Sequence, residues 1–291
     1  MTIFGRVCTA MVTPFDGKGN VDFQKTTQLI EYLINNGTDS LVISGTTGES
    51  PTLTTEEKLA LFKHVVKIVN KRVPVIAGTG NYNTKESVEL TEKAEEIGVD
   101  GILAVAPYYN KPNQEGLYQH FKAIAESTSL PLMVYNIPGR SVVNIEPETV
   151  VRLSEIPNIK AIKEASGNIV QMAEILRITP DDFELYSGDD SLTLPVLSIG
   201  GTGVVSVASH VIGNEIQQMI RAFLSGNHKE ASEWHLKLLP LMEGLFMAPS
   251  PAPVKTALQI KGLNVGSVRL PLVPLTENER NRLTELMKPF I

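Results

Sequence analysis

One pattern recurs along most of the chain, from near the amino terminus to about residue 225. A short apolar, β-branched run is followed by a turn marked by Gly or Pro and then by an amphipathic helical stretch. The eight predicted strands span residues 7–14, 40–45, 73–78, 101–107, 130–136, 159–163, 184–187 and 203–208. Most are apolar on both faces, as is typical of parallel strands covered by helices on one side and by a packed interior on the other.

Helical patterns lie between these strands, for example at residues 22–36, 54–70, 84–97 and 113–127. Thr54 is a favourable helix cap, and Glu56 and Glu57 follow it in the first turn, where acidic side chains favour the helix dipole. Eight such units, each roughly 20 to 35 residues long, predict an α/β protein with a closed (β/α)8 TIM barrel. An open doubly wound sheet with appended helices is the alternative.

The strand pattern stops after about Gly226. Residues 228–247, 253–260 and 276–288 have helical patterns, separated by proline-rich stretches. We therefore assign residues 1–225 to the barrel and residues 226–291 to a C-terminal helical extension of the same domain.

Charge and composition exclude several classes of protein. A formal net charge of −6 argues against nucleic-acid binding, which requires a basic surface. No run of about 18 apolar residues is long enough to cross a membrane. The amino terminus does not resemble a signal peptide, and the single cysteine, Cys8, allows no disulfide within the chain. We expect a soluble, cytoplasmic protein.

The predicted sixth strand carries a lysine in an apolar run, in the sequence IKAIKEAS. If Ala161 faces the barrel interior, the period of two places Lys163 there as well. Burial disfavours the charged amine, and a neutral amine can add to a ketone to form an imine. The alternative is a lysine at a strand end that extends its amine to water.

Barrel enzymes place their chemistry at the carboxyl ends of the strands, and other polar residues stand there. Tyr135 ends the fifth strand beside Lys163, where its phenol can shuttle protons; alternatively it only closes the barrel mouth. Arg140 follows a Pro–Gly turn and can hold a carboxylate, unless it is simply a surface arginine. The second strand ends in GTTGES, whose amides and the hydroxyls of Thr46 and Thr47 can bind a carboxylate and relay protons.

Two other kinds of site receive little support from the sequence. The five histidines show no ligand spacing, so we predict no metal. We also expect no organic cofactor, because an imine on Lys163 would itself serve as the electron sink. Ser187–Asp190 and Gly200–Gly203 lie after the seventh strand and before the eighth, where many barrels bind phosphate, but neither matches a full phosphate-loop pattern.

Four motifs, taken in order, resemble those of the pyruvate-dependent class I aldolase family. They are GTTGES at residues 45–50, PYYN at 107–110, YNIPGR at 135–140 and IKEAS at 162–166. The resemblance runs from Thr9 to about residue 260. Arg140 favours the synthase branch, which condenses pyruvate with L-aspartate-4-semialdehyde in the first committed step of diaminopimelate and lysine biosynthesis.

The resemblance implies a role for each matching residue. Lys163 forms the Schiff base with pyruvate, and Tyr135, Thr46 and Tyr109 form the proton relay. Tyr109 would reach into the site of a neighbouring subunit, so the active unit is at least a dimer; a homotetramer built as a dimer of dimers is common in the family. The implied substrate-binding residues are Thr47, Arg140, Gly188 and Val205.

Three alternatives remain open from the sequence alone. Another pyruvate aldolase, acting on N-acetylneuraminate or on a 2-keto-3-deoxy-sugar acid, differs from the synthase branch at Arg140. A barrel that binds a keto acid without catalysis would not need Lys163, Tyr135 and Thr46 together. A phosphate-binding isomerase would need a stronger glycine pattern near Gly200.

One departure from the family pattern concerns regulation. Synthases that are inhibited by lysine resemble one another in a site at a subunit interface, which includes two histidines and an asparagine. At those three positions this chain has Thr55, Lys58 and Tyr82. The chain retains three other positions of that site, Ser50, Glu86 and Tyr108. Lys58 places a like charge beside a cationic effector, so we predict that feedback inhibition by lysine is weak or absent.

Overall fold

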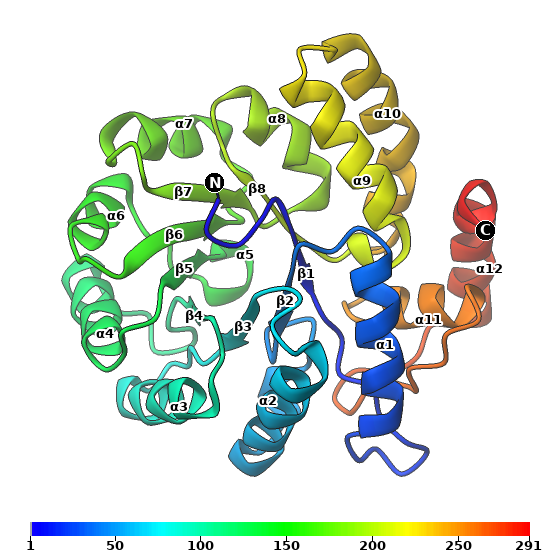
Figure 1. Cartoon of the computed structure of the whole chain (residues 1–291), viewed down its shortest axis with the longest axis horizontal. Helices are drawn as coiled ribbons and strands as arrows, with labels where there is room; N and C mark the ends of the chain where they lie inside the picture. Colours follow the sequence, from blue (N-terminus) through cyan, green and yellow to red (C-terminus); the bar gives the residue numbers. More distant parts are fainter. Residues whose placement is uncertain (1) are drawn as a thin grey trace.

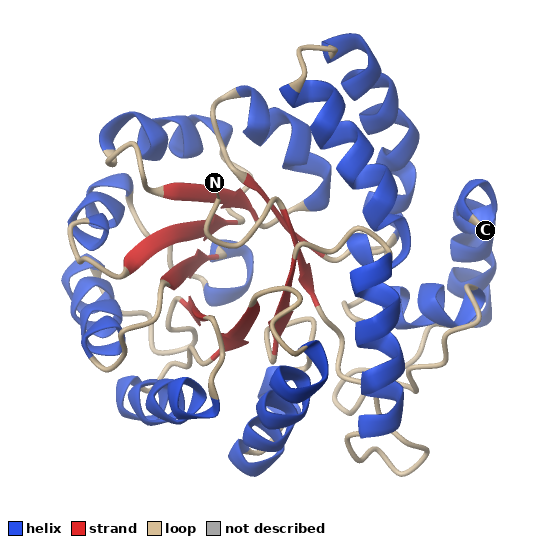
Figure 2. Ribbon diagram, in the orientation of Figure 1, coloured by secondary structure: helices blue, strands red, loops and turns tan. Residues whose placement is uncertain are grey.

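The computed structural model describes residues 2–291. Its centre is a closed barrel of eight parallel strands in sequential order, each paired with the next and β1 paired with β8 (Figures 1 and 2). The strands are β1 (Val7–Ala10), β2 (Ser40–Ile43), β3 (Val75–Gly78), β4 (Gly101–Val105), β5 (Leu132–Asn136), β6 (Ile159–Glu164), β7 (Glu184–Ser187) and β8 (Gly203–Ser206). The predicted (β/α)8 barrel is confirmed.

Helices surround this barrel (Figure 2). They are α1 (Phe23–Asn35), α2 (Thr55–Val69), α3 (Thr84–Ile97), α4 (Gln114–Glu126), α5 (Pro138–Ser141), α6 (Pro147–Ser154), α7 (Ile169–Ile178), α8 (Thr193–Ser198) and α9 (Ser209–Leu224). Residues 2–291 also contain short 3₁₀ turns, namely η1 (Ser50–Thr52), η2 (Asp190–Leu192) and η3 (Lys288–Phe290). Short α5 directly follows β5 and carries Arg140 at the barrel mouth.

Local sequence sets the helix ends. Thr54 accepts a hydrogen bond from the Glu57 backbone, and the Glu57 side chain accepts one from the Thr54 backbone, so α2 begins with a complete capping box. Gly98 ends α3 with φ +94°, a left-handed conformation that favours glycine.

Four predicted strands are longer than the observed ones, because the chain turns into loops at their carboxyl ends; they are the predictions at 7–14, 40–45, 101–107 and 203–208. Ser44, for example, has φ 55° just after β2.

The apolar side chains form two separate cores. The larger core fills the space between the strands and the helices. The smaller core fills the barrel interior and consists of Phe4, Cys8, Ala10, Val42, Ile76, Leu103, Met133, Tyr135, Ala161, Tyr186 and Val205. Along β6, Ala161 belongs to the interior core and Ile162 to the outer one, so the alternation of a buried strand is maintained.

The last part of the chain is helical and lies at one side of the barrel (Figure 1). It contains α10 (His228–Gly244), α11 (Ala252–Ile260) and α12 (Glu277–Met287). Helix α10 packs on α9, and α11 packs on both α9 and α12. Within residues 2–291, no helix has the length and apolar character needed to cross a membrane.

Candidate active site

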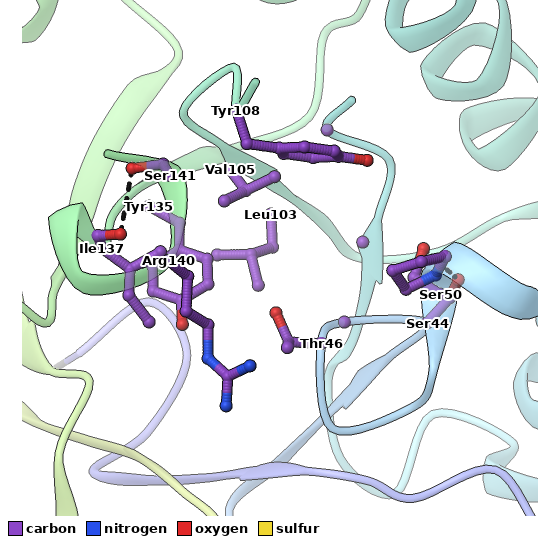
Figure 3. Close-up of a pocket in the computed structure, with 14 residues that line it drawn as sticks. Ser44, Thr46, Ser50, Leu103, Val105, Tyr108, Tyr135, Ile137, Arg140 and Ser141 are labelled. Atoms are coloured by element: carbon purple, nitrogen blue, oxygen red, sulfur yellow. Dashed lines mark hydrogen bonds between the residues drawn. The ribbon is translucent and has the colours of Figure 1, made fainter. Parts of the chain in front are cut away.

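A cavity of about 220 Å³ opens at the carboxyl ends of β2 to β5 (Figure 3). Its wall combines small, apolar and hydrogen-bonding groups, as small-molecule sites commonly do. The lining residues are Ser44, Gly45, Thr46, Ser50, Pro51, Gly78, Gly80, Leu103, Val105, Tyr108, Tyr135, Ile137, Arg140 and Ser141. The cavity lies where a barrel enzyme is expected to carry its site.

Two glycines let the strand ends approach one another beside this cavity. A Cβ atom on Gly78 would lie 2.4 Å from the Ser44 carbonyl oxygen, and one on Gly80 would lie 2.2 Å from the Val105 nitrogen. Any larger residue would therefore push the end of β3 away from its neighbours. The sequence analysis did not single out these two positions, although the sequence GTG after the third strand was a visible signal.

Lys163 lies inside the barrel next to this cavity. It pairs with Tyr135 in the β5–β6 register, its side chain is buried, and its amine nitrogen lies 4.1 Å from the centre of the Tyr135 ring. Tyr135 belongs to the cavity wall, so the Lys163 amine lies against a residue that lines the cavity. The predicted orientation of Lys163 toward the barrel interior is confirmed.

Burial lowers the pKa of Lys163 to about 8 from an ordinary value of 10.5. The charges of Asp190 and Cys8 oppose this shift, and the nearby Arg140 cation adds to it. Burial also favours the neutral form of Tyr135, whose pKa rises to about 12, with smaller opposing effects from Arg140 and Thr46. Near neutral pH the site therefore combines an amine that deprotonates readily with a phenol that keeps its proton.

Three polar side chains face this region together. Figure 3 shows the Tyr135 and Thr46 hydroxyls and the Arg140 guanidinium on the same part of the cavity wall. No salt bridge to Arg140 is formed within the part of the chain that the structure describes. Its guanidinium is therefore available for a carboxylate ligand.

The remaining predicted site residues do not line this cavity. Val205 belongs to the interior core, which also contains Tyr135. A Cβ on Gly188 would lie 3.1 Å from Cε of Lys163, so Gly188 is next to the lysine side chain. Thr47 is buried but is not part of the cavity wall. Tyr109 is 89% exposed, has φ 74° and does not line the cavity of its own chain.

Asp190 is a buried neighbour of Lys163 that was not predicted as a site residue. Its carboxylate is buried and accepts hydrogen bonds from the backbone of Val207 (3.0 Å) and Ala208 (2.9 Å) and from the Ser206 hydroxyl. Burial raises its pKa, and these hydrogen bonds oppose the increase. The sequence GDD after the seventh strand was considered only as a phosphate loop, since sequence alone does not show which carboxylate turns inward.

Comparison with known proteins identifies the family. The model of the dihydrodipicolinate synthetase family matches residues 3–289. The chain belongs to this family. It is 66% identical over 282 residues to the 4-hydroxy-tetrahydrodipicolinate synthase of Bacillus subtilis (strain 168), covering 97% of each chain. It is 65% identical over 283 residues to the enzyme of the same name from Bacillus velezensis, covering 97% of this chain and 98% of the relative.

A solved structure supports the same assignment to the dihydrodipicolinate synthetase family. The dihydrodipicolinate synthase from Bacillus anthracis matches with a TM-score of 0.97 and 64% identity, covering 99% of each chain. As a member of this family the chain is an enzyme, a lyase of the class I aldolase type. The resemblance predicted from the four motifs is confirmed, and the comparisons favour the synthase branch over the sugar-acid aldolases.

Proposed function

We propose that this member of the dihydrodipicolinate synthetase family condenses pyruvate with L-aspartate-4-semialdehyde to give 4-hydroxy-tetrahydrodipicolinate, the first committed step of diaminopimelate and lysine biosynthesis. The names of the relatives support the reaction. The observation that carries the mechanism is the buried Lys163 amine packed on the Tyr135 ring beside the cavity. No metal or organic cofactor takes part, because an imine on the lysine serves as the electron sink.

The first stage captures pyruvate. The neutral Lys163 amine attacks the keto carbon, the carbinolamine loses water, and a protonated imine forms. A methyl proton then leaves, and its electron pair moves toward the imine nitrogen to give an enamine. Tyr135, Thr46 and Tyr109 carry the protons in these steps, and Tyr135 suits this role because its phenol remains protonated near neutral pH.

The second stage forms a carbon–carbon bond and a ring. The enamine carbon attacks the aldehyde while the Arg140 guanidinium holds the carboxylate of the semialdehyde with paired hydrogen bonds. The amino group of the substrate then attacks the imine carbon and displaces the Lys163 amine. The six-membered ring leaves, and water released at imine formation balances the reaction.

The other substrate-binding roles follow the family pattern. Thr47 and its backbone amide hold the pyruvate carboxylate, and Gly188 and Val205 shape the pocket around the Schiff base. Gly188 suits this role because its missing side chain leaves room for the end of Lys163.

The proposal includes assembly into at least a dimer, and a homotetramer built as a dimer of dimers is the form we expect. Tyr109 supports this, because it is 89% exposed and does not line the cavity of its own chain, so its side chain is accessible to a neighbouring subunit. Its left-handed backbone conformation, φ 74°, is uncommon for tyrosine, as is often seen at functional positions.

Borohydride reduction in the presence of pyruvate tests the mechanism. We expect a reduced adduct on the peptide that contains Lys163, and none in Lys163→Met. Lys160→Met is a matched control, because Lys160 lies on the same strand but is partly exposed and paired with Asp182 at 3.2 Å. An unmodified Lys163 peptide, or an adduct on another residue, would refute the mechanism.

Substrate assays test the reaction itself. Pyruvate and the semialdehyde should turn over together, whereas N-acetylneuraminate and 2-keto-3-deoxy-sugar acids should not be cleaved at a comparable rate. Cleavage of a sugar acid with no condensation activity would assign the chain to the alternative branch.

A further inference from the structure

The chain has a second deeply buried lysine that the proposed mechanism does not use. Lys255, on α11, is 2% exposed, and its amine nitrogen lies 2.6 Å from Oε1 of Glu49, which is equally buried. The amine also donates a hydrogen bond to the Ser267 carbonyl at 2.8 Å and lies 4.2 Å from the centre of the Phe15 ring. A C-terminal helix thus carries a charge into the base of the β2–α2 loop.

Glu49 is part of the turn that carries the two threonines of the site. Its backbone N–H donates to the Thr46 carbonyl at 3.0 Å, and the Ser50 N–H donates to the Gly45 carbonyl at 3.2 Å. Glu49 has φ 58°, a left-handed conformation that is unfavourable for a residue with a side chain. A fixed partner for its carboxylate therefore holds the turn in a shape that it would not adopt freely.

Arg269 strengthens the same attachment. Its backbone N–H donates to Oε2 of Glu49 at 2.8 Å, so both carboxylate oxygens are bound by the C-terminal segment. Its guanidinium donates to the Thr52 carbonyl at 2.7 Å and pairs with Glu57 in the first turn of α2. The loop from Gly45 to Thr52 is thus held by residues that follow the barrel.

We propose that the buried Lys255–Glu49 pair is a positioning device for the reaction, by which the C-terminal helices hold the β2–α2 loop so that Thr46 and Thr47 are directed at pyruvate. A pair kept only for stability has little physical advantage here, because well-packed apolar side chains stabilise a protein interior as well as a buried ion pair does. The pair instead fixes the orientation of the Glu49 side chain and, through it, the conformation of the turn. Lys255 and Glu49 are positioning residues, since neither lines the cavity.

This inference rests on the proposed function, because it assigns Thr46 and Thr47 to pyruvate. Three variants separate positioning from stability: Lys255→Met, the double variant Glu49→Gln/Lys255→Met, and Lys255→Arg, which keeps the charge. The double variant leaves no unpaired buried charge, so we expect it to fold. The control is Glu31→Gln/Arg72→Met, which removes an exposed pair with a 2.6 Å contact between α1 and the loop that follows α2.

The measurements are kcat, the KM of each substrate, the midpoint of urea unfolding and the rate of borohydride trapping with pyruvate. In the double variant we expect the KM for pyruvate to rise about tenfold and trapping to slow about as much, because misplaced binding groups weaken capture. The KM for the semialdehyde should stay within about twofold, since Arg140 lies on α5 and not on this loop. Lys255→Arg should recover most of the pyruvate affinity, and the control should match the parent enzyme.

The possible results decide between the two roles. A purely structural pair would reduce the amount of active enzyme, and so kcat, without changing the KM for pyruvate; that result, or normal trapping in the double variant, overturns the inference. If the double variant does not fold, Glu49→Gln measured at pH 9 decides, because burial lowers the pKa of Lys255 to about 8 and its amine is then mostly neutral rather than an unpaired charge; an unchanged KM for pyruvate refutes the inference. Failure of the parent enzyme to be trapped by pyruvate would instead refute the proposed function.

Discussion

Lys163 and Tyr135 are opposite each other on neighbouring strands, and the lysine amine lies over the face of the tyrosine ring, 4.1 Å from its centre. An aromatic face attracts an ammonium ion, which by itself would favour the charged amine. Burial acts in the opposite direction and dominates, so the pKa of Lys163 falls to about 8. The pair therefore places an amine that deprotonates readily next to a phenol that keeps its proton.

The first prediction concerns the pH dependence of pyruvate capture. With a pKa of about 8, roughly one amine in ten is neutral at pH 7, about 300 times the fraction expected at a pKa of 10.5. The rate of borohydride trapping at limiting pyruvate should therefore rise about tenfold per pH unit below pH 8 and level off above it. Trapping rates measured from pH 6 to pH 10 test this. A rise that continues to pH 10 would contradict the lowered pKa.

The second prediction concerns stability. The pKa of Lys163 is lower in the folded chain, so between about pH 8 and 10.5 the unfolded chain binds more protons and stability rises with pH. At pH 7 the shift corresponds to about 3 kcal/mol of destabilisation at 1.36 kcal/mol per pKa unit. Lys163→Met should therefore raise the free energy of unfolding at pH 7 by about that amount, and the gain should shrink toward pH 10.

Urea unfolding at several pH values measures this effect, with Lys160→Met as the control for loss of a partly exposed lysine. The control should change the free energy of unfolding little, because ion pairs near the surface contribute little. A Lys163→Met variant no more stable than the parent at pH 7 would show that the native site holds the charged amine without strain.

The sequence predicted the barrel and the orientation of Lys163 because both follow from local periodicity. An apolar strand of period two determines which side chains face the interior, and the carboxyl ends of parallel strands meet at one end of a barrel. The Lys255–Glu49 pair could not be predicted in this way, since it joins a C-terminal helix to a turn that is distant in sequence and shares no pattern with it. The same limit applied to Asp190, whose inward orientation depends on tertiary hydrogen bonds.

The third prediction tests whether Tyr109 acts across an interface. Tyr109→Phe should lower turnover sharply and leave the fold intact, because the side chain is exposed on its own chain. Mixing it with Lys163→Ala, with subunit exchange allowed, should restore activity, since a mixed dimer contains one site with both native residues. Random pairing should give about a quarter of the parent activity. Absence of restored activity despite demonstrated exchange, or near-normal activity of Tyr109→Phe alone, would contradict the shared relay.

The fourth prediction concerns the space beside Lys163. An added Cβ on Gly188 would lie 2.6 Å from the Cβ of Ala165 and 3.1 Å from Cε of Lys163, so Gly188→Ala must displace one of them. We expect trapping by pyruvate to slow by about tenfold or more, because a small displacement of a reacting group has a large effect on rate. Gly17→Ala is the control, since nothing lies within 4 Å of its added Cβ. Equal trapping rates in the two variants would show that Gly188 does not limit the position of the amine.

The last prediction is that L-lysine at sub-millimolar concentration does not inhibit the enzyme. Lys58 is partly buried, which lowers its pKa, and the charge of Glu86 opposes that shift, so the two side chains are close enough to interact. The Glu86 carboxylate also accepts hydrogen bonds from Asn81 at 2.7 Å and Asn83 at 2.9 Å. A carboxylate engaged in this way, beside a resident cation, is a poor partner for a second ammonium group.

Removal of the positive charge of Lys58 should make the enzyme more sensitive to inhibition by lysine. Lys58→Gln is expected to increase sensitivity to lysine, whereas Lys63→Gln, at an exposed position on the same helix, should leave it unchanged. Condensation rates measured at increasing lysine concentrations compare the parent and both variants. Strong inhibition of the parent below 1 mM would refute the prediction, and an unchanged response in Lys58→Gln would show that the charge of Lys58 is not what excludes lysine.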